Sequence, residues 1–393
     1  MNKIEQLISR YCPNEVEWKM LGEVCDIFTG GEAPSNNIKG NVPNSILKFP
    51  IYGNGAEIYG YTDTYKIDKD AVTISSIGAN TGTIYFRKAF FTPIIRLKVV
   101  IPKHNNLLPR YLFHYLNSIT ISSKSSSVPN MNASDVKKIP APIPPLSVQK
   151  EIVRILDTFT KLTEELTEEL TARKKQYDYY REELFYFDNE KTQHLPLGDD
   201  SIGKFTRGGG LQKKDFAEVG IGCIHYGQIY TYYGTYTYKT KTFVSEEFAK
   251  KARKAKYGDL VIATTSENDE DVCKAVAWLG DTEIAISSDA CFYSHCLHPK
   301  YVAFYFQTEQ FQKQKRSLIT GTKVRRVNAD DLAKIKIPVP SPEEQERIVA
   351  ILDKFDTLTT SISEGLPKEI ELRKKQYEYY RDMLLTFPKK ENV

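Results

Sequence analysis

A nine-residue string that occurs twice constrains the fold of this chain more than any other feature. "RKKQYDYYR" begins at Arg173 and "RKKQYEYYR" begins at Arg373, and the two strings differ only at Asp178 and Glu378. A long string that returns after half a chain indicates two copies of one structural plan.

Longer and looser matches surround these strings. "VQKEIVRILDTF" at Val148 matches "EQERIVAILDKF" at Glu344, and "VPNMNASDVKKIPAPIP" at Val128 matches "VRRVNADDLAKIKIPVP" at Val324. Between the matches the two halves of the chain share little sequence. The chain is therefore predicted to alternate between variable regions and helices, with the helices and their junctions repeated.

The repeated segments have the residue spacing of long helices that pair. From Ile152 to Phe187 and from Ile348 to Phe387, mostly apolar residues recur at alternating intervals of four and three positions. This heptad spacing is typical of a coiled-coil seam. A helix of about 40 residues is roughly 60 Å long, and we expect the two helices to run antiparallel.

The second helical segment contains one irregularity. Ile362, Leu366 and Ile370 are separated by two consecutive intervals of four, and Gly365 and Pro367 lie among them. Such a four-residue stutter keeps the seam on one side of the helix. Because a proline inside a helix costs about 3 kcal/mol, we expect a kink or a short break there.

The variable regions combine strand and helix patterns. "AVTISSIG" and "DLVIATTS" are β-rich runs bounded by turn residues, whereas "PRYLFHYLNS" reads as a helix. We predict an α+β fold with two mixed α/β domains separated by two long antiparallel coiled-coil helices, in a pseudo-two-fold internal repeat. The predicted boundaries are 1–145 and 188–341 for the domains, 146–187 for the first helix, and 342–393 for the second helix and tail.

The distribution of charge assigns nucleic-acid binding to the variable regions. The net charge is +4, but residues 146–187 carry −2 and residues 342–387 carry −3, so the rest of the chain carries +9. A basic excess of this kind is the usual footprint of a nucleic-acid surface. The helical segments are therefore not expected to form that surface.

The cysteines and the hydropathy of the chain favour the cytoplasm. Six cysteines without regular spacing are typical of a reducing compartment. No run approaches the roughly 20 apolar residues that cross a bilayer, and "MNKIEQLISRYCPNE" lacks the apolar core of a secretion signal. We expect a cytoplasmic protein without membrane contacts.

Three sequence motifs resemble active or metal sites, and each has a simpler interpretation. "GDDSIGK" is followed by Phe205, where a phosphate-binding loop needs Ser or Thr. "CFYSHCLH" crowds its ligands too closely for a structural zinc site, so Cys291 is interpreted as a buried cysteine in a strand. The acidic run near Asp271 is interpreted as a solvated loop. Neither a catalytic site nor a metal site is therefore predicted.

The predicted DNA-binding residues are cationic or amide side chains in loops of the variable regions. "TGTKVRRVN" and "KSSSVPNMN" stand at equivalent places in the two halves with different chemistry, as expected of loops that read different bases. The alternative is an exposed basic loop, or for "YFRKAFF" the flank of a strand. The predicted set comprises Lys323, Arg325, Arg326, Lys124, Asn130, Asn132, Arg207, Lys213, Lys214, Arg87 and Lys88.

The whole chain resembles the specificity subunit of type I restriction–modification systems. The resemblance is most specific in "IPVPSPEEQERIVAILDKFDTLT" and "LTARKKQYDYYREELF". It implies two target-recognition domains, each reading half of a split double-stranded DNA site, held apart by the helices. It also implies that the helices dock two modification methyltransferase subunits, which recruit restriction motor–nuclease subunits.

The same resemblance implies a subunit that catalyses nothing and holds no cofactor, with S-adenosylmethionine, ATP and Mg²⁺ on the partner subunits. Outward-facing side chains of the repeated strings are then candidates for binding partner subunits, or DNA that spans the gap between the half-sites, although a solvated helix face would look the same. These candidates are Lys174, Lys175, Gln176, Lys374, Lys375 and Gln376.

Two other functions stay open at this point. A stand-alone nuclease would use the acidic run near Asp271 and would cleave DNA with a metal ion. A structural coiled-coil repeat protein would show no sequence-selective DNA binding. Neither explains why two dissimilar domains accompany nearly identical helices.

Overall fold

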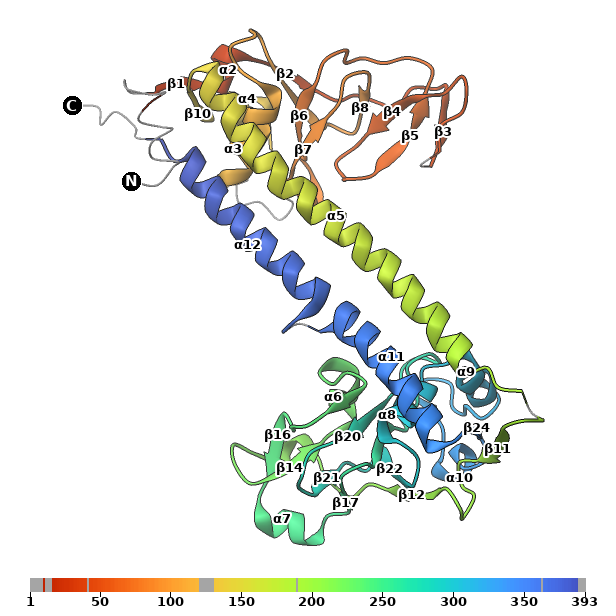
Figure 1. Cartoon of the computed structure of the whole chain (residues 1–393). Helices are drawn as coiled ribbons and strands as arrows, with labels where there is room; N and C mark the ends of the chain where they lie inside the picture. Colours follow the sequence, from red (N-terminus) through yellow and green to blue (C-terminus); the bar gives the residue numbers. More distant parts are fainter. Residues whose placement is uncertain are drawn as a thin grey trace. The chain divides into compact units, whose positions relative to one another are not determined.

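The computed structural model describes residues 10, 16–40, 42–119, 131–188, 190–361 and 363–387. The chain forms two compact units (Figure 1). Unit 1 comprises residues 1–165 and 370–393, and unit 2 comprises residues 166–369. Each unit contains one variable region together with parts of the long helices.

The variable region of unit 1 contains two four-stranded sheets. The main sheet has the order β2-β9-β6-β7, and all its neighbours are antiparallel. The second sheet has the order β3-β5-β4-β8, with β8 parallel to β4. The strands are β2 (Cys25–Thr29), β3 (Asn37–Lys39), β4 (Phe49–Tyr52), β5 (Ile58–Thr62), β6 (Ala71–Ile74), β7 (Ile84–Arg87), β8 (Thr92–Pro93) and β9 (Lys98–Pro102).

The variable region of unit 2 repeats this topology. Its main sheet has the order β12-β22-β18-β20-β15, and its second sheet has the order β13-β16-β14-β21-β17, with β21 parallel to β14. The strands are β12 (Gly203–Arg207), β13 (Phe216–Ala217), β14 (Ile221–Ile224), β15 (Tyr236–Thr237), β16 (Thr242–Val244), β17 (Lys254–Ala255), β18 (Leu260–Ala263), β20 (Ala275–Trp278), β21 (Ile284–Ile286) and β22 (Ala290–His295). The first four strands of each sheet correspond between the units, so the repeat includes the variable regions.

A proline-containing ribbon joins the start and the end of each variable region. In unit 1, β1 (Glu17–Met20) pairs with β10 (Pro140–Ile143), and in unit 2, β11 (Gln193–Pro196) pairs with β24 (Lys336–Val339). A buried tyrosine holds each ribbon: the Tyr111 hydroxyl donates to the Pro142 carbonyl at 3.1 Å, and the Tyr301 hydroxyl donates to the Pro338 carbonyl at 2.9 Å.

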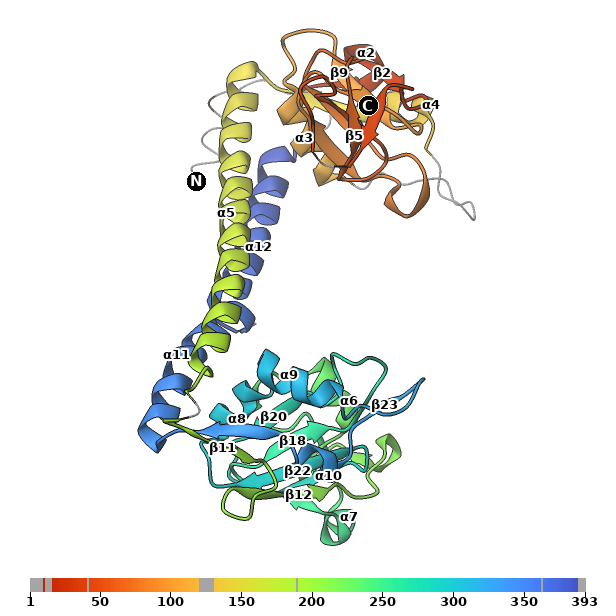
Figure 2. The same ribbon diagram turned by 90° about the vertical axis from the view of Figure 1, so that its right-hand side faces the viewer.

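Short helices complete the variable regions. Both α3 (Pro109–Ser118) and α8 (Pro299–Tyr305) begin with proline, which suits the first turn of a helix because no backbone donor is lost there. In unit 2, α8 and α9 (Glu309–Arg316) lie on one side of the main sheet (Figure 2). The other short helices are α2 (Leu21–Val24), α4 (Ala133–Lys137), α6 (Tyr226–Thr231), α7 (Glu246–Lys251) and α10 (Ala329–Leu332), with 3₁₀ turns η1 (Gly78–Asn80) and η2 (Lys213–Asp215).

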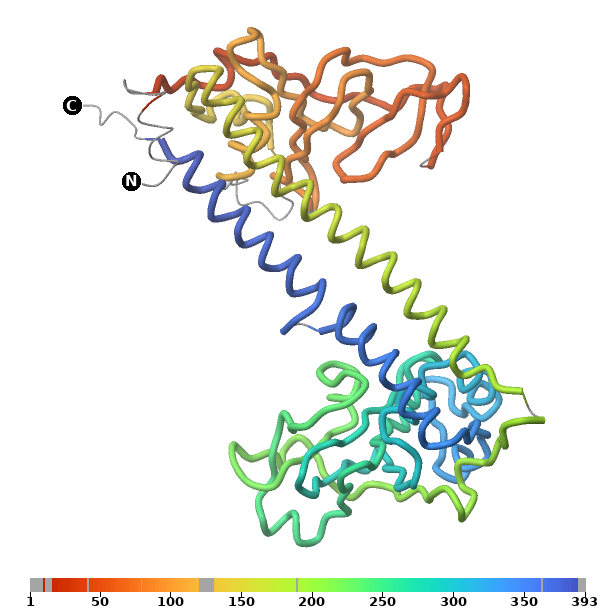
Figure 3. The backbone as a smooth tube through the Cα atoms, in the orientation of Figure 1, coloured from red at the N-terminus to blue at the C-terminus, as the bar shows by residue number. Residues whose placement is uncertain are grey.

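The two long helical segments differ in continuity. The first is one helix, α5 (Leu146–Leu184), whereas the second consists of α11 (Pro342–Thr360) and α12 (Gly365–Leu385) (Figure 3). The predicted short break is therefore confirmed, although Ile362 of the predicted stutter lies outside the described residues. Gly365 has a φ of 81°, and a Cβ there would overlap the carbonyl oxygen of Thr357.

Equivalent aromatic pairs join the long helices within each unit. In unit 1, Phe159 of α5 stacks on Tyr380 of α12 with 5.1 Å between ring centroids. In unit 2, Phe355 of α11 stacks on Tyr180 of α5 at 5.5 Å. The early part of one segment thus meets the late part of the other in both units, which is the pairing expected of antiparallel helices.

Buried glutamines anchor the helices to the domains. The Gln149 side-chain oxygen accepts a hydrogen bond from the Leu108 backbone at 2.8 Å, and Gln345 accepts one from the His298 backbone at 2.8 Å. The main hydrophobic core of each unit also includes residues from its domain and from its helices. Each domain is therefore built as one body with its own part of the helical pair.

Candidate nucleic-acid interface

In unit 2, four segments that are distant in sequence line one surface hollow. They are the end of β12 with Arg207, residues 264–265 after β18, the turn after β21 with Ser288 and Asp289, and the segment from Arg326 through Asn328 to Asp330. The last segment leads into α10, which lies beside β12 (Figure 2). The structure thus brings two predicted DNA-binding residues, Arg207 and Arg326, together.

Glycines allow the segment after β12 to pass close to the turn after β21, beside this hollow. The backbone N–H of Gly208 donates to the Ala290 carbonyl at 2.9 Å, and that of Gly209 donates to the Ile286 carbonyl at 2.8 Å. A Cβ on Gly208 would overlap the carbonyl oxygen of Ser287. The side chain that precedes these glycines, Arg207, is exposed and its Nε donates to the Ser288 carbonyl at 3.3 Å.

Lys213 and Lys214 are exposed at the start of η2. The charge of Lys213 reaches the buried His225, whose pKa is held below its ordinary value by burial and by Lys213, against the opposing effect of Asp289. Of the predicted cations, Arg207 of β12 and Arg326 of β23 (Arg325–Arg326) line the hollow itself.

The predicted basic loop contains two kinds of cation. Arg325 is half-buried; its Nη1 donates to the Gly321 carbonyl at 2.6 Å and its Nε pairs with Asp269 at 2.8 Å. Lys323 and Arg326 are exposed, and among the described residues their side chains have no hydrogen-bond or ion-pair partner. Arg325 thus fixes the loop to the acidic run, while Lys323 and Arg326 are free to bind a ligand.

The acidic run has a structural explanation as well. Asp269 pairs with Arg325, and the Asp271 carboxylate accepts a hydrogen bond from the Asn268 side chain at 2.8 Å. Among the described residues, no three His, Cys, Asp or Glu side chains converge as metal ligands. Cys291 is buried in β22, which confirms its interpretation as a strand cysteine.

Unit 1 contains a turn equivalent to the one that lines the hollow of unit 2, with different side chains. The Ser76 hydroxyl donates to the Arg96 carbonyl at 2.6 Å, just as the Thr264 hydroxyl donates to the Asp289 carbonyl at 3.0 Å. The backbone contact between Met131 and Ser76, at 3.0 Å, likewise repeats in unit 2 between residues 327 and 264 at 3.1 Å. The turn at residues 94–97 is therefore equivalent to the turn at residues 287–290.

The predicted residues of unit 1 have different positions. Asn132 is exposed and precedes α4, just as Asn328 precedes α10. Lys124 and Asn130 lie outside the described residues. Lys88 is exposed and pairs with Asp70 at 3.2 Å.

Arg87 differs from the prediction. Its side chain is buried, with 8% of the residue exposed, and its guanidinium donates to the carbonyls of Gly55 and Ala56 at 2.9 and 3.0 Å. The guanidinium also lies 3.9 Å from the ring centroid of Tyr52 and 4.6 Å from that of Tyr85. Arg87 thus supports the loop between β4 and β5 and is not available to DNA in this structure.

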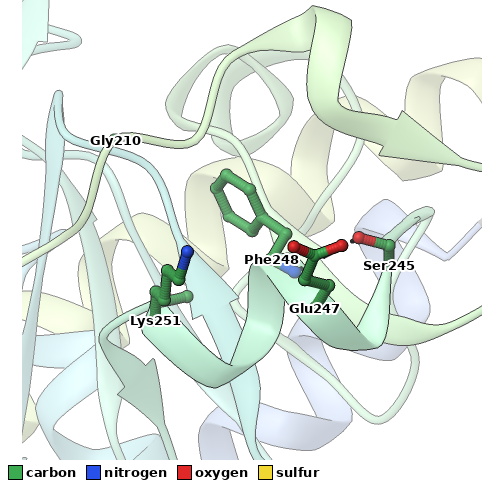
Figure 4. A pocket seen from close by; sticks show the side chains of 6 residues that line it. Gly210, Ser245, Glu247, Phe248 and Lys251 are labelled. Carbon is green, nitrogen blue, oxygen red and sulfur yellow. Dashed lines mark hydrogen bonds between the residues drawn. The ribbon is translucent and has the colours of Figure 1, made fainter.

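A second hollow in unit 2 lies between the loop at Gly210 and α7 (Figure 4). Ser245 accepts a hydrogen bond from the Phe248 backbone at 3.2 Å and so caps α7. The side chains of Glu247 and Lys251 both line this hollow and carry opposite charges. The hollow at Arg207 and Arg326 is likewise mixed in charge, because Asp289 and Asp330 line it as well.

The predicted partner-binding residues lie at equivalent places on α5 and α12. Lys174, Lys175, Lys374 and Lys375 are exposed. Gln176 and Gln376 are half-buried, and each accepts a hydrogen bond at 3.0 Å from the arginine three residues before it in its string. Two exposed tyrosines, Tyr179 and Tyr379, extend the repeated surface, with 60% of each residue exposed.

Comparisons with known proteins agree with this double architecture. A family model described as the type I restriction modification DNA specificity domain matches the chain twice, at residues 13–173 and 213–372. The chain belongs to this family. It is 33% identical to the specificity subunit of the type I restriction enzyme EcoR124I/EcoR124II from Escherichia coli, over 100% of this chain and 99% of that protein.

Further relatives cover the chain to a similar extent. A putative type I restriction enzyme specificity subunit of Haemophilus influenzae is 32% identical over 95% of this chain and 96% of the relative. Among solved structures, the S subunit of a type I restriction–modification system from M. genitalium matches with a TM-score of 0.56 at 18% identity, covering 96% of this chain and 97% of that one. The fold predicted from the sequence is therefore confirmed as that of a specificity subunit.

Several residues of this specificity subunit's site were not predicted, namely Arg96, Lys98, Ser288 and Asp289. No local signal identifies them, because "IIRLK" at 94–98 and "SSDAC" at 287–291 share no residue at equivalent positions. Only the tertiary hydrogen bonds align the two turns.

No described helix of the subunit is both long and apolar enough to cross a membrane.

Proposed function

We propose that this specificity subunit reads an asymmetric, bipartite double-stranded DNA site, with one half-site for each variable domain. The observation that carries the proposal is the equivalent turn, strand end and loop in both units, with different side chains at the exposed positions. One scaffold with two sets of side chains suits the recognition of two different base sequences.

The candidate contacts divide by chemistry. Exposed cations of unit 2, including Lys213, Lys214, Lys323 and Arg326, suit phosphates or guanine edges. Asn132 and Asn328 present amides that suit adenine. Phosphate contacts would fix the register of the protein on DNA, and base contacts would set the sequence.

The helices are proposed to dock two modification methyltransferase subunits, which in turn bring the restriction motor–nuclease subunits. Supporting this, the exposed lysines and tyrosines occur twice at equivalent positions, as two copies of one partner require. We propose that the subunit itself catalyses nothing, and that S-adenosylmethionine, ATP and Mg²⁺ act on the partner subunits.

The test is to express the subunit together with its methyltransferase subunit in a host that lacks other DNA methylation, and to map methylated positions. We expect one motif with two specified halves and an unspecified gap, and no methylation from either subunit alone. Metal-dependent cleavage of DNA by the purified subunit alone would support the nuclease alternative. Methylation without a consistent motif would contradict the proposal.

A further inference from the structure

The equivalent turns of the two units carry opposite charges. In unit 1, the Leu97 backbone donates to the Ile94 carbonyl at 3.1 Å, and in unit 2, the Ala290 backbone donates to the Ser287 carbonyl at 3.1 Å. The third residue of each turn is held by a hydroxyl from the main sheet, as described above. That third residue is Arg96 in unit 1 and Asp289 in unit 2.

The backbone at these positions is fixed while the side chain is not. The hydroxyl of Thr264 holds the main-chain carbonyl of Asp289, not its carboxylate. Within the described residues the carboxylate has no hydrogen-bond or ion-pair partner, and Asp289 is half-exposed. Arg96 is exposed, and its guanidinium is likewise without a partner in the part of the chain that the structure describes.

The surroundings of Asp289 indicate what its carboxylate could bind. It lines the hollow together with Arg207, Arg326 and Asp330, and among the described residues it forms no ion pair with either arginine. A carboxylate at a DNA surface is repelled by phosphates, so a favourable contact of this side chain with DNA would be to a base donor. In the major groove only the amino groups of cytosine and adenine offer donors to it.

We propose that Asp289 and Arg96 are specificity-determining residues that read bases in the two half-sites. Asp289 accepts a hydrogen bond from the exocyclic amino group of cytosine or adenine, and Arg96 donates to the O6 and N7 atoms of guanine. The inference rests on the proposed function, because it names residues of the same DNA-reading site.

The experiment uses the full complex with the methyltransferase subunit and compares methylation motifs of point variants. Asp289→Ala should make one base position degenerate in the half-site of unit 2, with roughly a 10- to 100-fold loss of discrimination there. The half-site of unit 1 should not change. Arg96→Ala should give the mirror result, with loss of discrimination for guanine in the other half-site only.

Matched controls separate base reading from general effects of charge. Asp281 and Lys69 are exposed, and Asp281→Ala and Lys69→Ala remove one charge each from unit 2 and unit 1. Both controls should keep the wild-type motif. Asp289→Asn keeps the size of the side chain but removes its charge and replaces one acceptor oxygen with an NH2 donor, so a changed base preference at that one position supports the proposal even if Asp289→Ala does not fold.

An unchanged motif in Asp289→Ala and Asp289→Asn would overturn the inference. Uniformly weaker methylation without a degenerate position would also overturn it, because a supporting residue acts on all sequences alike. If the wild-type complex methylates no bipartite site, the proposed function fails instead, so the two failures are distinguishable.

Discussion

Two buried glutamines, Gln149 and Gln345, make the same three-way connection in the two units. Each accepts a backbone N–H at the start of a domain helix, and each donates to a proline carbonyl, Pro144 at 2.8 Å or Pro340 at 3.0 Å. Truncating such a side chain leaves buried backbone groups without partners, which costs about 1–3 kcal/mol for each group.

We therefore expect Gln149→Ala and Gln345→Ala each to reduce the free energy of unfolding by roughly 2–6 kcal/mol, since at least two backbone groups lose a partner in each variant. Denaturant unfolding of the purified subunit measures the change. Gln193→Ala, at an exposed position, is the matched control and should leave stability unchanged. A loss in only one of the two buried variants would argue against equivalent anchoring.

His114 makes the stability of unit 1 depend on pH. Its ring is fully buried and connects Tyr377, at 3.2 Å from Nδ1, with Asp157, at 2.7 Å from Nε2. Burial lowers the pKa of His114, and the bond to Asp157 only partly opposes this. For Asp157, burial raises the pKa, but the hydrogen bonds from His114 and Arg110 outweigh it and lower the pKa.

Both shifts have the same sign for stability. In the unfolded chain the histidine takes up a proton near its ordinary pKa of about 6.5. In the folded unit the pKa of His114 is lower, so protonation favours the unfolded chain and stability falls as pH falls below about 6.5. We expect His114→Phe, which installs the residue type of Phe304 at the equivalent place, to flatten this dependence between about pH 7 and 5. Unfolding midpoints across this range provide the measurement, with the exposed His104→Gln as the control. An unchanged slope in His114→Phe would assign the pH dependence to other groups.

At the scale of the helix, Gly365 sets where the second long segment resumes. A residue with a Cβ at a φ of 81° is strained, and here it would also overlap a carbonyl oxygen of α11. We expect Gly365→Ala to destabilise unit 2 by on the order of 1–3 kcal/mol, as measured by thermal unfolding. Gly210→Ala, at a site with open space, should be neutral.

The length of α5 is the basis of a second prediction at this scale. The string "LTEELTEE" at residues 162–169 repeats a four-residue unit inside this helix. One more unit adds roughly 6 Å and about 40° beyond a full turn, and one base pair of DNA rises about 3.4 Å and turns about 35°.

An inserted LTEE should therefore keep both half-sites and widen the unread gap by one or two base pairs. Methylome mapping of the insertion variant shows the new gap directly. A methylating variant that retains the original gap would show that this helix does not set the spacing.

The elements that the sequence predicts well are those whose signal is local. The heptad seams identify the long helices, and Gly365 with Pro367 identify the break, because periodicity and backbone restrictions act over a few residues. The hollow could not be predicted, since Arg207, Asp289 and Arg326 meet only through strand pairing and turn contacts. The burial of Arg87 could not be predicted, because an arginine at the end of a strand looks the same in sequence whether its guanidinium faces solvent or buried carbonyls.

At the scale of the whole molecule, the shared topology of the variable regions predicts that they are exchangeable. Residues 188–341 begin and end beside the ribbon of β11 and β24, which keeps the junctions together. Replacing this segment with that of a related specificity subunit should replace one half of the recognised sequence and leave the other half alone. Mapping the methylation motif of the hybrid tests this, and a motif altered in both halves would contradict it.

The cations beside the two turns have a consequence for how such sites change their specificity. In unit 1, Lys98 on β9 faces Thr29 on β2, while in unit 2, Arg207 on β12 faces Cys291 on β22. The positive charge is thus kept by the strand pair but moves to the opposite strand. An alignment of the two units by position shows two unrelated substitutions, although each strand pair contains one cation. Any route from one arrangement to the other by single changes passes through a strand pair with no cation or with two.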